Sequence, residues 1–438
     1  MKIAILGFAG QGQSAYEYWS KDSNELTICD IDSTLKLPLG AKGQLGEDYL
    51  KNLGSYDVIV RTPGLHPREI AQANPEVPDI LNRVTSVTNE FFKVCPTRNI
   101  IGVTGTKGKG TTSTLIAKML ESAGYRVHLG GNIGIPPLEL LKNNIQADDW
   151  VVLELANFQL IDLKHSPHIG VCLMVEPEHL NWHDGIDEYL EAKRQMFRYQ
   201  AENDIAVYYA DNNYSLSIAG ASSATLIPYM APPGAEVKGK DIVIGKEKVC
   251  SVADIRLLGR HNWQNVCAAV TAVWQICQDR AALKSAISAF VGLPHRLEFV
   301  REIDGVRYYN DSFASAPGAA IAAMDAVKGT KVMIVGGFDR GLELEDMARA
   351  MVMHKDKLRR LVLIGASAHK LETELKAHGF TNYDIVLSKK MQDIVQRAKS
   401  IARQGDSIVF SPGFASFDMF KNFEDRGLQY KEVVNALA

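Results

Sequence analysis

Short apolar runs alternate with amphipathic stretches along almost the whole chain. Near its start, Lys2–Leu6, Leu26–Cys29 and Val58–Val60 have the character of buried strands, and Ser14–Trp19 has a helical pattern. Strands and helices that alternate in this way predict a mostly parallel sheet covered by helices. The same pattern continues downstream, with further strands expected at Asn99–Val103, Val151–Leu155, Ile169–Val175, Val332–Val335, Arg360–Ile364, Ile385–Leu387 and Ser407–Phe410.

Two breaks divide this series into three segments. One lies at Val94–Thr97 and the other at Gly292–Pro294, and both contain proline. A chain of 438 residues is also too long for one hydrophobic core. We therefore expect three α/β domains, at residues 1–94, 95–293 and 294–438, of which the first and last are Rossmann-like and the central one has a mostly parallel sheet. Turn signals between Asp204 and Ile255 predict β-rich excursions within the second domain.

The composition of the chain disfavours several classes of protein. Hydrophobic residues make up 46% and charged residues 23%, and the formal net charge of -3 disfavours a general nucleic-acid binder. The six cysteines form no C-x-x-C pair, which predicts buried free thiols in a reducing compartment. The opening residues MKIAILGF indicate a first strand and not a signal peptide, and no apolar run approaches the roughly 18 residues of a membrane span. A cytoplasmic protein without a membrane or nucleic-acid partner is expected.

The first segment carries a glycine turn, Gly7–Gly12, between its first strand and first helix. Asp30 ends the second strand, and Thr62 follows the third. This order of strand, glycine turn, helix, strand and acid is typical of a nucleotide-binding α/β unit. The glycines do not follow the standard G-x-G-x-x-G spacing, so a plain tight turn remains an alternative.

The strongest motif is the glycine-rich stretch Gly102–Thr112, which follows an expected strand and precedes the helical stretch Ser113–Ser122. Backbone N–H groups of such a turn, together with the helix N-terminus, favour bound phosphate. Lys109 is placed to reach the outer phosphates, and a hydroxyl of Thr111 or Thr112 to hold Mg²⁺. The motif predicts a nucleotide-binding P-loop, with a purely structural loop as the alternative.

Three further side chains become candidate site residues when they are considered together with this loop. Glu154 ends an expected strand, where a carboxylate points into the ligand crevice of a parallel sheet, although a surface acid is the ordinary interpretation. His179 and His183 have helical i,i+4 spacing, but the H-E-x-x-H order of a zinc helix is absent, which favours a single histidine, His179, at a strand end. The local sequence around Lys193 favours, without the context of the P-loop, a solvated lysine on a helix.

Motifs farther along the chain also lie at the ends of expected helices and strands. Asn262 and Asn265 share one face near an expected helix start, where amides cap a helix or bind a purine edge. In the last segment, two glycine-containing turns, Gly336–Gly341 and Ser411–Ser416, follow strands and are expected to line a crevice.

The motifs in this order, from the P-loop through Glu154-Leu155-Ala156-Asn157-Phe158-Gln159, Pro294-His295-Arg296 and Asn310-Asp311-Ser312 to Ser411–Gly427, resemble the Mur ligase family. The resemblance covers nearly the whole chain, and Ser416–Gly427 is most similar to the members that add D-glutamate. It implies an ATP-dependent ligase of cell-wall precursor synthesis with an acyl-phosphate intermediate. It also implies three domains, which bind a UDP-sugar acceptor, ATP and an amino acid, and a P-loop ATPase fold for the central one.

The resemblance assigns roles to individual residues. It implies catalysis by Lys109, Glu154, His179 and Lys193, the last carbamylated by CO₂. It also implies the cofactors ATP and two Mg²⁺ ions, the ions held by Thr111, Glu154, His179 and Lys193. The implied ATP-binding residues are Gly105, Thr106, Lys107, Gly108, Lys109, Gly110, Thr111, Thr112, Asn262, Asn265, Arg296 and Asp311. The implied residues for the acceptor and the amino acid are Asp30, Thr62, Asn132, Gln159, Ser315, Arg340, Ser416 and Phe423.

Three positions depart from the family pattern. Gly110 stands where the family has a hydroxyl residue, which is similar to folylpolyglutamate synthases, and Phe313 and Arg340 replace two usual lysines at the amino-acid site. L-glutamate is therefore the rival of D-glutamate as substrate. A folylpolyglutamate synthase-like ligase and a non-catalytic nucleotide-binding paralogue are the alternative functions, and the expected state is a monomer.

Overall fold

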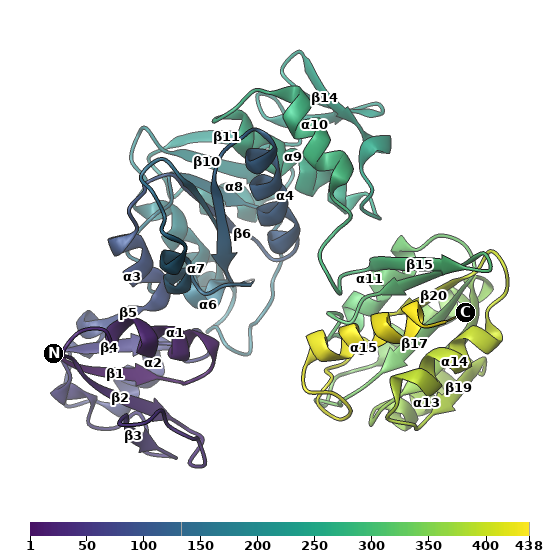
Figure 1. Cartoon of the computed structure of the whole chain (residues 1–438), viewed down its shortest axis with the longest axis horizontal. Helices are drawn as coiled ribbons and strands as arrows, with labels where there is room; N and C mark the ends of the chain where they lie inside the picture. Colours follow the sequence, from purple (N-terminus) through teal and green to yellow (C-terminus); the bar gives the residue numbers. More distant parts are fainter. Residues whose placement is uncertain (133, 438) are drawn as a thin grey trace. The chain divides into compact units, whose positions relative to one another are not determined.

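The computed structural model describes residues 1–132 and 134–437. These residues fold into two compact units, one made of residues 1–132, 134–255 and 261–289 and the other of residues 256–260 and 290–437. The first unit contains two parallel sheets and a small antiparallel sheet, and the second contains one large sheet (Figure 1). Each unit is described by itself below.

The N-terminal sheet is wholly parallel, in the order β3-β2-β1-β4-β5. The strands predicted near residues 2, 26 and 58 are confirmed, whereas β3 and β5 were not predicted because they are short and partly polar. Its strands are β1 (Lys2–Leu6), β2 (Glu25–Asp30), β3 (Lys42–Leu45), β4 (Val58–Arg61) and β5 (Val84–Ser86). Its helices are α1 (Gly10–Trp19), α2 (Pro67–Ala73) and α3 (Val87–Val94).

The central sheet is also parallel, in the order β11-β10-β9-β6-β8-β7. Its strands are β6 (Ile100–Thr104), β7 (Val127–Gly131), β8 (Trp150–Glu154), β9 (Ile169–Cys172), β10 (Ile205–Tyr209) and β11 (Thr225–Tyr229). Helices α4 (Lys109–Ser122), α9 (His261–Trp274) and α10 (Arg280–Ala289) pack together, as do α6 (Asn157–Leu160), α7 (Ile186–Arg198) and α8 (Asn213–Ala219). The short helix α5 (Pro137–Leu140) packs against α1 and α3.

The prediction for residues 204–255 is partly wrong. Strands β10 and β11 are not an excursion, because their apolar runs extend the central sheet by parallel pairing with β9. Only β12 (Ala235–Lys238), β13 (Asp241–Ile244) and β14 (Glu247–Ser251) form a separate antiparallel sheet. Hydrophobic pattern alone does not tell which sheet a strand joins.

The N-terminal and central sheets share one hydrophobic core. A single cluster of buried side chains runs from Ile3, Ile5 and Val60 of the first sheet to Val151 and Leu153 of the second. Burial of such apolar surface is the main favourable term in folding. The two sheets are therefore built as one body, although a proline-containing break separates them in the sequence.

The sheet of the second unit has the order β15-β16-β20-β17-β18-β19, in which only β15 and β16 pair antiparallel. Its strands are β15 (Glu298–Ile303), β16 (Val306–Asn310), β17 (Lys331–Gly336), β18 (Leu358–Ile364), β19 (Tyr383–Val386) and β20 (Ser407–Phe410). Its helices are α11 (Pro317–Ala326), α12 (Glu345–Met353), α13 (Ala368–Ala377), α14 (Met391–Ile401) and α15 (Phe423–Asn435). The hairpin of β15 and β16 was not predicted, because polar residues interrupt its apolar pattern.

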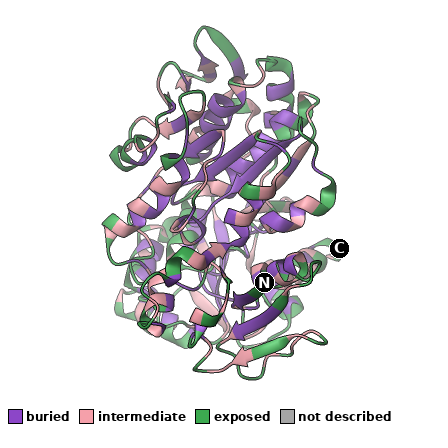
Figure 2. Ribbon diagram, turned by 90° about the vertical axis from the view of Figure 1, so that its left-hand side faces the viewer, coloured by how far each residue is buried: buried purple, intermediate pink, exposed green. Residues whose placement is uncertain are grey.

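Strands β17 and β20 in the middle of this sheet are buried along their whole length, and Figure 2 shows the same burial, in purple, for the middle strands of the central sheet. Met333 and Val335 pack into one core cluster, whereas Val332 and Ile334 of the same strand pack into another. Successive side chains of a strand point to opposite faces, so the continuous apolar run of β17 indicates helices on both sides. The doubly wound α/β fold predicted for this segment is confirmed.

Two smaller expectations can be compared with the structure. All six cysteines are free thiols, but Cys95 and Cys277 are only half-buried, whereas the other four are buried. Among the described residues, no helix combines the length and the apolar character that a membrane span requires.

Candidate active site

The P-loop connects β6 to α4. Gly105 and Gly108 both have positive φ angles, +145° and +88°, and Gly108 is the N-cap of α4. A Cβ atom on Gly105 would lie 2.7 Å from the Cβ of Leu173, and one on Gly108 would overlap Oδ1 of Asn265. The loop therefore needs glycine at both positions for backbone geometry and for space.

The two predicted asparagines lie at this loop. Asn262 and Asn265 occupy the first turn of α9, both are buried, and Nδ2 of Asn265 donates to Oδ1 of Asn262 at 2.8 Å. The Asn265 amide also forms the wall against Gly108. Gly108 and Asn265, which are far apart in the sequence, thus together fix the shape of the P-loop turn.

This contact predicts the result of Gly108→Ala. We expect the KM for ATP to rise about 10-fold, because the new methyl group displaces the Asn265 amide and strains a left-handed backbone. Gly124→Ala is the matched control, since Gly124 has a φ of +89° with nothing within 4 Å of its Cβ position. Steady-state kinetics with varied ATP measures the effect, and an equal change in both variants would contradict the role of Asn265.

Strand register brings three strand ends together at the P-loop. Val103 of β6 pairs with Glu154 of β8, and Thr104 pairs with Cys172 of β9. Glu154 is buried, and its Oε1 accepts a hydrogen bond from Nδ2 of Asn132 at 2.8 Å. The prediction that Glu154 lies at a strand end beside the P-loop agrees with this geometry.

Two lysines from different helices converge on the same carbonyl group. Nζ of Lys109 donates to the carbonyl oxygens of Gly105 and Thr106, at 3.0 and 2.9 Å. Nζ of Lys193, on α7, donates to the Gly105 oxygen at 3.1 Å. Lys193 is thus not a solvated helix lysine, because it is only 1% exposed.

The environment of Lys193 favours its neutral form. Burial, and then the positive charge of Lys109, lower the pKa of Lys193 to about 7. The ordinary pKa of a lysine is about 10.4. A neutral amine is nucleophilic and able to react with CO₂, whereas an ammonium is not. Lys193 therefore has the reactivity that carbamylation requires.

His179 lies farther from its strand than predicted. Strand β9 ends at Cys172 and not at Val175, although backbone hydrogen bonds from Leu173 N–H to Thr104 and from Thr106 N–H to Met174 still join the two segments. His179 has a left-handed φ of 58°, and its ring centroid lies 4.8 Å from that of Phe158. Burial lowers the pKa of His179, opposed by Glu178 and reinforced by the charges of Lys109 and Lys193.

His183 is separate from His179. Residues 173–185 form loops and turns instead of a helix, so the i,i+4 spacing does not place the two rings on one face. His183 is buried against Asn157 and Glu188, and burial lowers its pKa to about 4. The geometry therefore also argues against a zinc site formed by His179 and His183 on one helix.

The remaining P-loop residues have the following positions. Oγ1 of Thr106 lies 2.8 Å from the hydroxyl of Tyr189 on α7, and Nζ of Lys107 pairs with Glu176. Gly110, Thr111 and Thr112 form the first turn of α4 and are buried.

Mg²⁺ prefers oxygen ligands, and this edge of the sheet offers them. Glu154 supplies a buried carboxylate, and the buried hydroxyl of Thr112 has no hydrogen-bond partner in the protein. Thr111 supplies a second hydroxyl in the same turn. An unmodified Lys193 offers no ligand, whereas a carbamate would add two oxygens. The residues present therefore fit magnesium once Lys193 is carbamylated.

The N-terminal sheet has its own switch point in strand order. In the order β3-β2-β1-β4-β5, the strand order reverses beside β1, and ligands of such sheets bind at that point. Asp30 accepts a hydrogen bond from the backbone N–H of Phe8 at 2.7 Å, and Oγ1 of Thr62 donates to the carbonyl of Leu6 at 2.7 Å. Both predicted residues thus border the glycine turn at this switch point.

Gln159 presents an unpaired donor. Its Oε1 accepts a hydrogen bond from the N–H of Ala156 at 3.0 Å, which closes the first turn of α6. Its Nε2 is buried and has no partner in the protein. Buried polar groups usually find a partner, so this amide is suited to a bound acceptor atom.

Six predicted residues lie in the second unit, at the carboxyl ends of β16, β20 and β17 or on adjoining turns: Arg296, Asp311, Ser315, Arg340, Ser416 and Phe423. Oδ2 of Asp311 accepts from the Ser411 hydroxyl at 2.6 Å, and Oδ1 accepts from the N–H of Leu297 at 2.9 Å. Burial raises the pKa of Asp311 to about 6, although both hydrogen bonds oppose the shift. Ser416 is buried, and Ser315 is exposed.

Aromatic side chains surround this edge. The guanidinium of Arg296 lies 4.5 Å from the ring of Phe313, and that of Arg340 lies 5.5 Å from the ring of Phe417. Phe313 and Phe423 meet edge to face at 5.0 Å. These contacts orient the two arginines, and a single sequence gives little signal for such stacking.

Sequence reasoning missed one structural arginine. Arg426 is fully buried on α15 and donates to the carbonyl groups of Ser312, Phe414 and Ala415 and to the Ser312 hydroxyl. It joins the loops that follow β16 and β20. Its position four residues after Asn422, the N-cap of α15, places it in the first turn of that helix.

Comparison with known proteins agrees with this geometry. Residues 103–273 match the Mur ligase middle domain, and residues 295–414 match the Mur ligase glutamate ligase domain. A UDP-N-acetylmuramoylalanine--D-glutamate ligase of Acetivibrio thermocellus is 36% identical over 463 residues, which cover 100% of this chain and 96% of the relative. The chain belongs to the Mur ligase family.

Other Mur ligases extend the comparison. A UDP-N-acetylmuramoylalanine--D-glutamate ligase of Clostridium novyi is 38% identical over 406 residues, which cover 91% of this chain and 87% of that protein. The crystal structure of the UDP-N-acetylmuramate-alanine ligase MurC of Thermotoga maritima has a TM-score of 0.61 and 15% identity, and covers 100% of this chain and 99% of that chain. The expected Mur ligase fold of three parallel-sheet domains is confirmed.

Proposed function

We propose that this Mur ligase joins D-glutamate to UDP-N-acetylmuramoyl-L-alanine, with ATP converted to ADP and phosphate. Relatives of 36% and 38% identity that match along nearly their whole length carry that activity in their names. The observation that carries the chemistry is the convergence of Lys109 and Lys193 on the Gly105 carbonyl, one strand away from Glu154. A regulatory paralogue without activity would have no need of this arrangement.

The proposal gives each segment a substrate. The switch point of the sheet in residues 1–94, with Asp30 and Thr62, would bind the UDP-sugar acceptor, together with Asn132 and Gln159. Residues 95–293 would bind ATP at the P-loop. Residues 294–438 would bind the amino acid, and Arg296 and Asp311 would contact the nucleotide. The presence of a complete N-terminal sheet favours a sugar-nucleotide acceptor over a folate.

The reaction follows from the chemistry of a carboxylate, which is a poor acyl donor. An oxygen of the acceptor carboxylate attacks the γ-phosphorus of ATP, the bond to the β-phosphate oxygen breaks, and ADP leaves. The amino group of glutamate then attacks the acyl carbon, and phosphate leaves as the amide forms. Lys109 offsets charge on the transferred phosphoryl group, which is the main protein contribution to such transfers.

Magnesium would supply additional positive charge at the phosphate oxygens when bound. Thr111, Glu154, His179 and carbamylated Lys193 are the proposed ligands for two ions. The six free thiols support a reducing compartment, and we propose the cytoplasm as the site of action.

The test is ATP turnover with a panel of acceptors and both glutamate enantiomers, in a preparation free of racemase. We expect turnover only with UDP-N-acetylmuramoyl-L-alanine and D-glutamate, with ADP and phosphate as products. Release of AMP and pyrophosphate would contradict the acyl-phosphate route. Turnover with a folate acceptor, or with L-glutamate in preference to the D form, would contradict the substrate assignment.

Arg340 tests the amino-acid site separately. Its guanidinium, held beside the Phe417 ring, is suited to bidentate binding of a carboxylate. Arg340→Ala should raise the KM for D-glutamate about 10-fold, because a charge-assisted hydrogen bond is lost. Arg349→Ala is the control, since Arg349 is exposed and pairs with Glu345 on α12. An unchanged KM for D-glutamate would remove Arg340 from the site.

A further inference from the structure

The segment that joins β4 to α2, from the last residue of the strand to the first turn of the helix (residues 61–68), is bound to the central domain. We name it the acceptor loop because it contains Thr62. Arg61 is buried and makes two hydrogen bonds to the carboxylate of Asp162, of 2.7 and 2.8 Å. Nε1 of Trp182 donates to the carbonyl of Gly64 at 3.2 Å. Both partners, Asp162 and Trp182, belong to the segment between α6 and α7.

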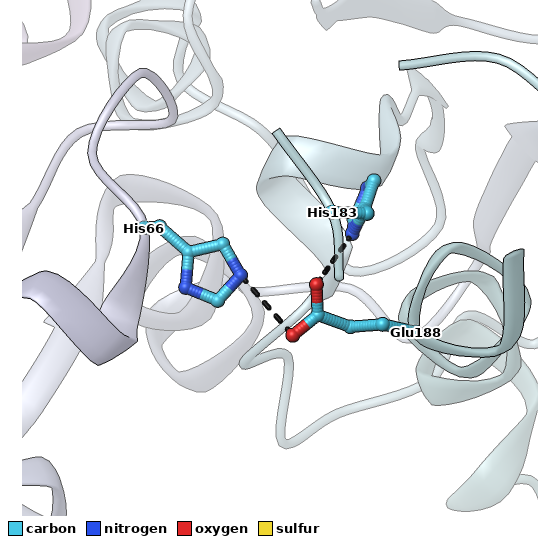
Figure 3. Close-up of side chains that lie close together, drawn as sticks. All are labelled: His66, His183 and Glu188. Carbon is cyan, nitrogen blue, oxygen red and sulfur yellow. Dashed lines mark hydrogen bonds and ion pairs between the residues drawn. The ribbon is translucent and has the colours of Figure 1, made fainter. Parts of the chain in front are cut away.

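A cluster of three ionisable side chains lies at the end of this loop (Figure 3). Nε2 of His66 lies 3.3 Å from Oε1 of Glu188, and Nδ1 of His183 lies 3.3 Å from Oε2 of the same carboxylate. His66 and His183 are 4% and 3% exposed. His66 is the N-cap of α2, and Glu188 lies in the first turn of α7. The cluster therefore connects the acceptor loop to α7.

Hydrogen bonds identify the protonated nitrogens. The backbone N–H of Arg68 donates to Nδ1 of His66 at 3.1 Å, so the proton of a neutral His66 is on Nε2, facing Glu188. Glu188 accepts from Nδ1 of His183, whose Nε2 then accepts from the amide of Asn157 at 2.7 Å. The carboxylate thus lies between two N–H groups: Nδ1 of His183 donates a hydrogen bond to it, whereas Nε2 of His66 lies within ion-pair distance without hydrogen-bond geometry.

This arrangement does not favour a metal ion. Metal-binding histidines present a lone pair to the ion and donate their other N–H to a second group. Nδ1 of His66 instead accepts a hydrogen bond, which leaves a proton where the ion would bind. The guanidinium of Arg68, 3.9 Å from Glu188, adds a positive charge. The contacts indicate a link held by protons.

Helix α7 extends from this link to the P-loop. Tyr189, the residue after Glu188, has its hydroxyl 2.8 Å from Oγ1 of Thr106. Lys193, one turn later, donates to the Gly105 carbonyl. One helix therefore contacts the acceptor loop with Glu188 and the P-loop with two other side chains.

We propose that Glu188 is a positioning residue, which holds the acceptor loop through His66 so that the acceptor carboxylate meets the γ-phosphate of ATP. The inference rests on the proposed function and adds a residue to it. The contacts of Glu188 are with His66, His183 and Arg68 and with the backbone N–H of Asp184. Its loss should therefore affect use of the acceptor much more than use of ATP.

Two variants break the link while conserving local structure. Glu188→Gln keeps the shape but turns an amide donor toward one of two N–H groups. His66→Asn retains an N-cap side chain for α2 and removes the Nε2 proton. Glu191→Gln is the matched control, because Glu191 lies one turn later on α7, is half-exposed, and pairs with Arg194 and Arg198.

The experiment measures kcat and KM for the acceptor and for ATP, and the Tm, in the wild type, the single variants and the double variant. We expect kcat/KM for the acceptor to fall about 10- to 100-fold in Glu188→Gln and His66→Asn, the loss typical of a small displacement of a reacting group. The KM for ATP should change less than about twofold, and Glu191→Gln should resemble the wild type. The double variant should be no worse than the poorer single variant, because the two side chains act through one contact.

Each other outcome contradicts the proposal. Lower Tm values with acceptor kinetics like those of Glu191→Gln would show a merely structural contact. Stabilisation of the wild type by one equivalent of Zn²⁺, absent in both variants, would show a metal site. If Glu188→Gln does not fold, His66→Asn decides alone. If the wild type turns over no acceptor, that result contradicts the proposed function instead. In that case, additive Tm changes in Glu188→Gln, His66→Asn and the double variant would contradict the link between His66 and Glu188.

Discussion

Lys193→Ala should lose about 1,000-fold in turnover, an effect of the size seen when a preorganised charge in an active site is removed. The reason is that the side chain is 1% exposed, has a pKa lowered to about 7 by burial and by Lys109, and lies at the P-loop. A carbamate formed there would place negative charge beside the magnesium that the site fits. Short carboxylic acids such as acetate or formate should partly restore activity.

The carbamate has a readout that does not depend on turnover. Labelled bicarbonate should give one carbamate signal in the wild type by nuclear magnetic resonance and none in Lys193→Ala. Lys118→Ala is the control, since Lys118 is an exposed lysine on α4 that pairs with Glu121. Full activity of Lys193→Ala, or its failure to respond to added acids together with a missing carbamate signal in the wild type, would contradict the modification.

Lys109→Ala should also lose about 1,000-fold in kcat, because the positive charge that faces the phosphates is removed. The side chain donates hydrogen bonds to backbone carbonyl groups of the loop, so the Tm should stay within a few degrees of the wild type. Kinetics and thermal unfolding measured together separate the two effects. Retained turnover, or loss of the fold, would contradict a role at the phosphates.

Local patterns predicted the parts of the fold that depend on nearby residues. The P-loop was found because its glycines and Lys109 lie within a few positions of one another, and β1, β6 and β17 were found because their apolar runs are continuous. Strands β3 and β5 were missed because short, partly polar segments have no such run. The hairpin of β15 and β16 was missed for a similar reason.

Long-range contacts explain most of what the sequence could not reveal. His66 and Glu188 are far apart along the chain, and a lone histidine carries no periodic signal that points to its partner. The same holds for Asn265, whose contact with Gly108 depends on the packing of α9 against α4. Lys193 was assigned its role through resemblance to a family, and its burial became visible only in the structure.

The position of β20 has a consequence for synthesis on the ribosome. This strand is the last in the chain, yet it pairs with both β16 and β17 in the middle of its sheet. The hairpin of β15 and β16 therefore cannot join the strands β17, β18 and β19 until Ser407–Phe410 has left the exit tunnel. The earlier two sheets are complete by then, so the second unit is the last part of the nascent protein to acquire a continuous core.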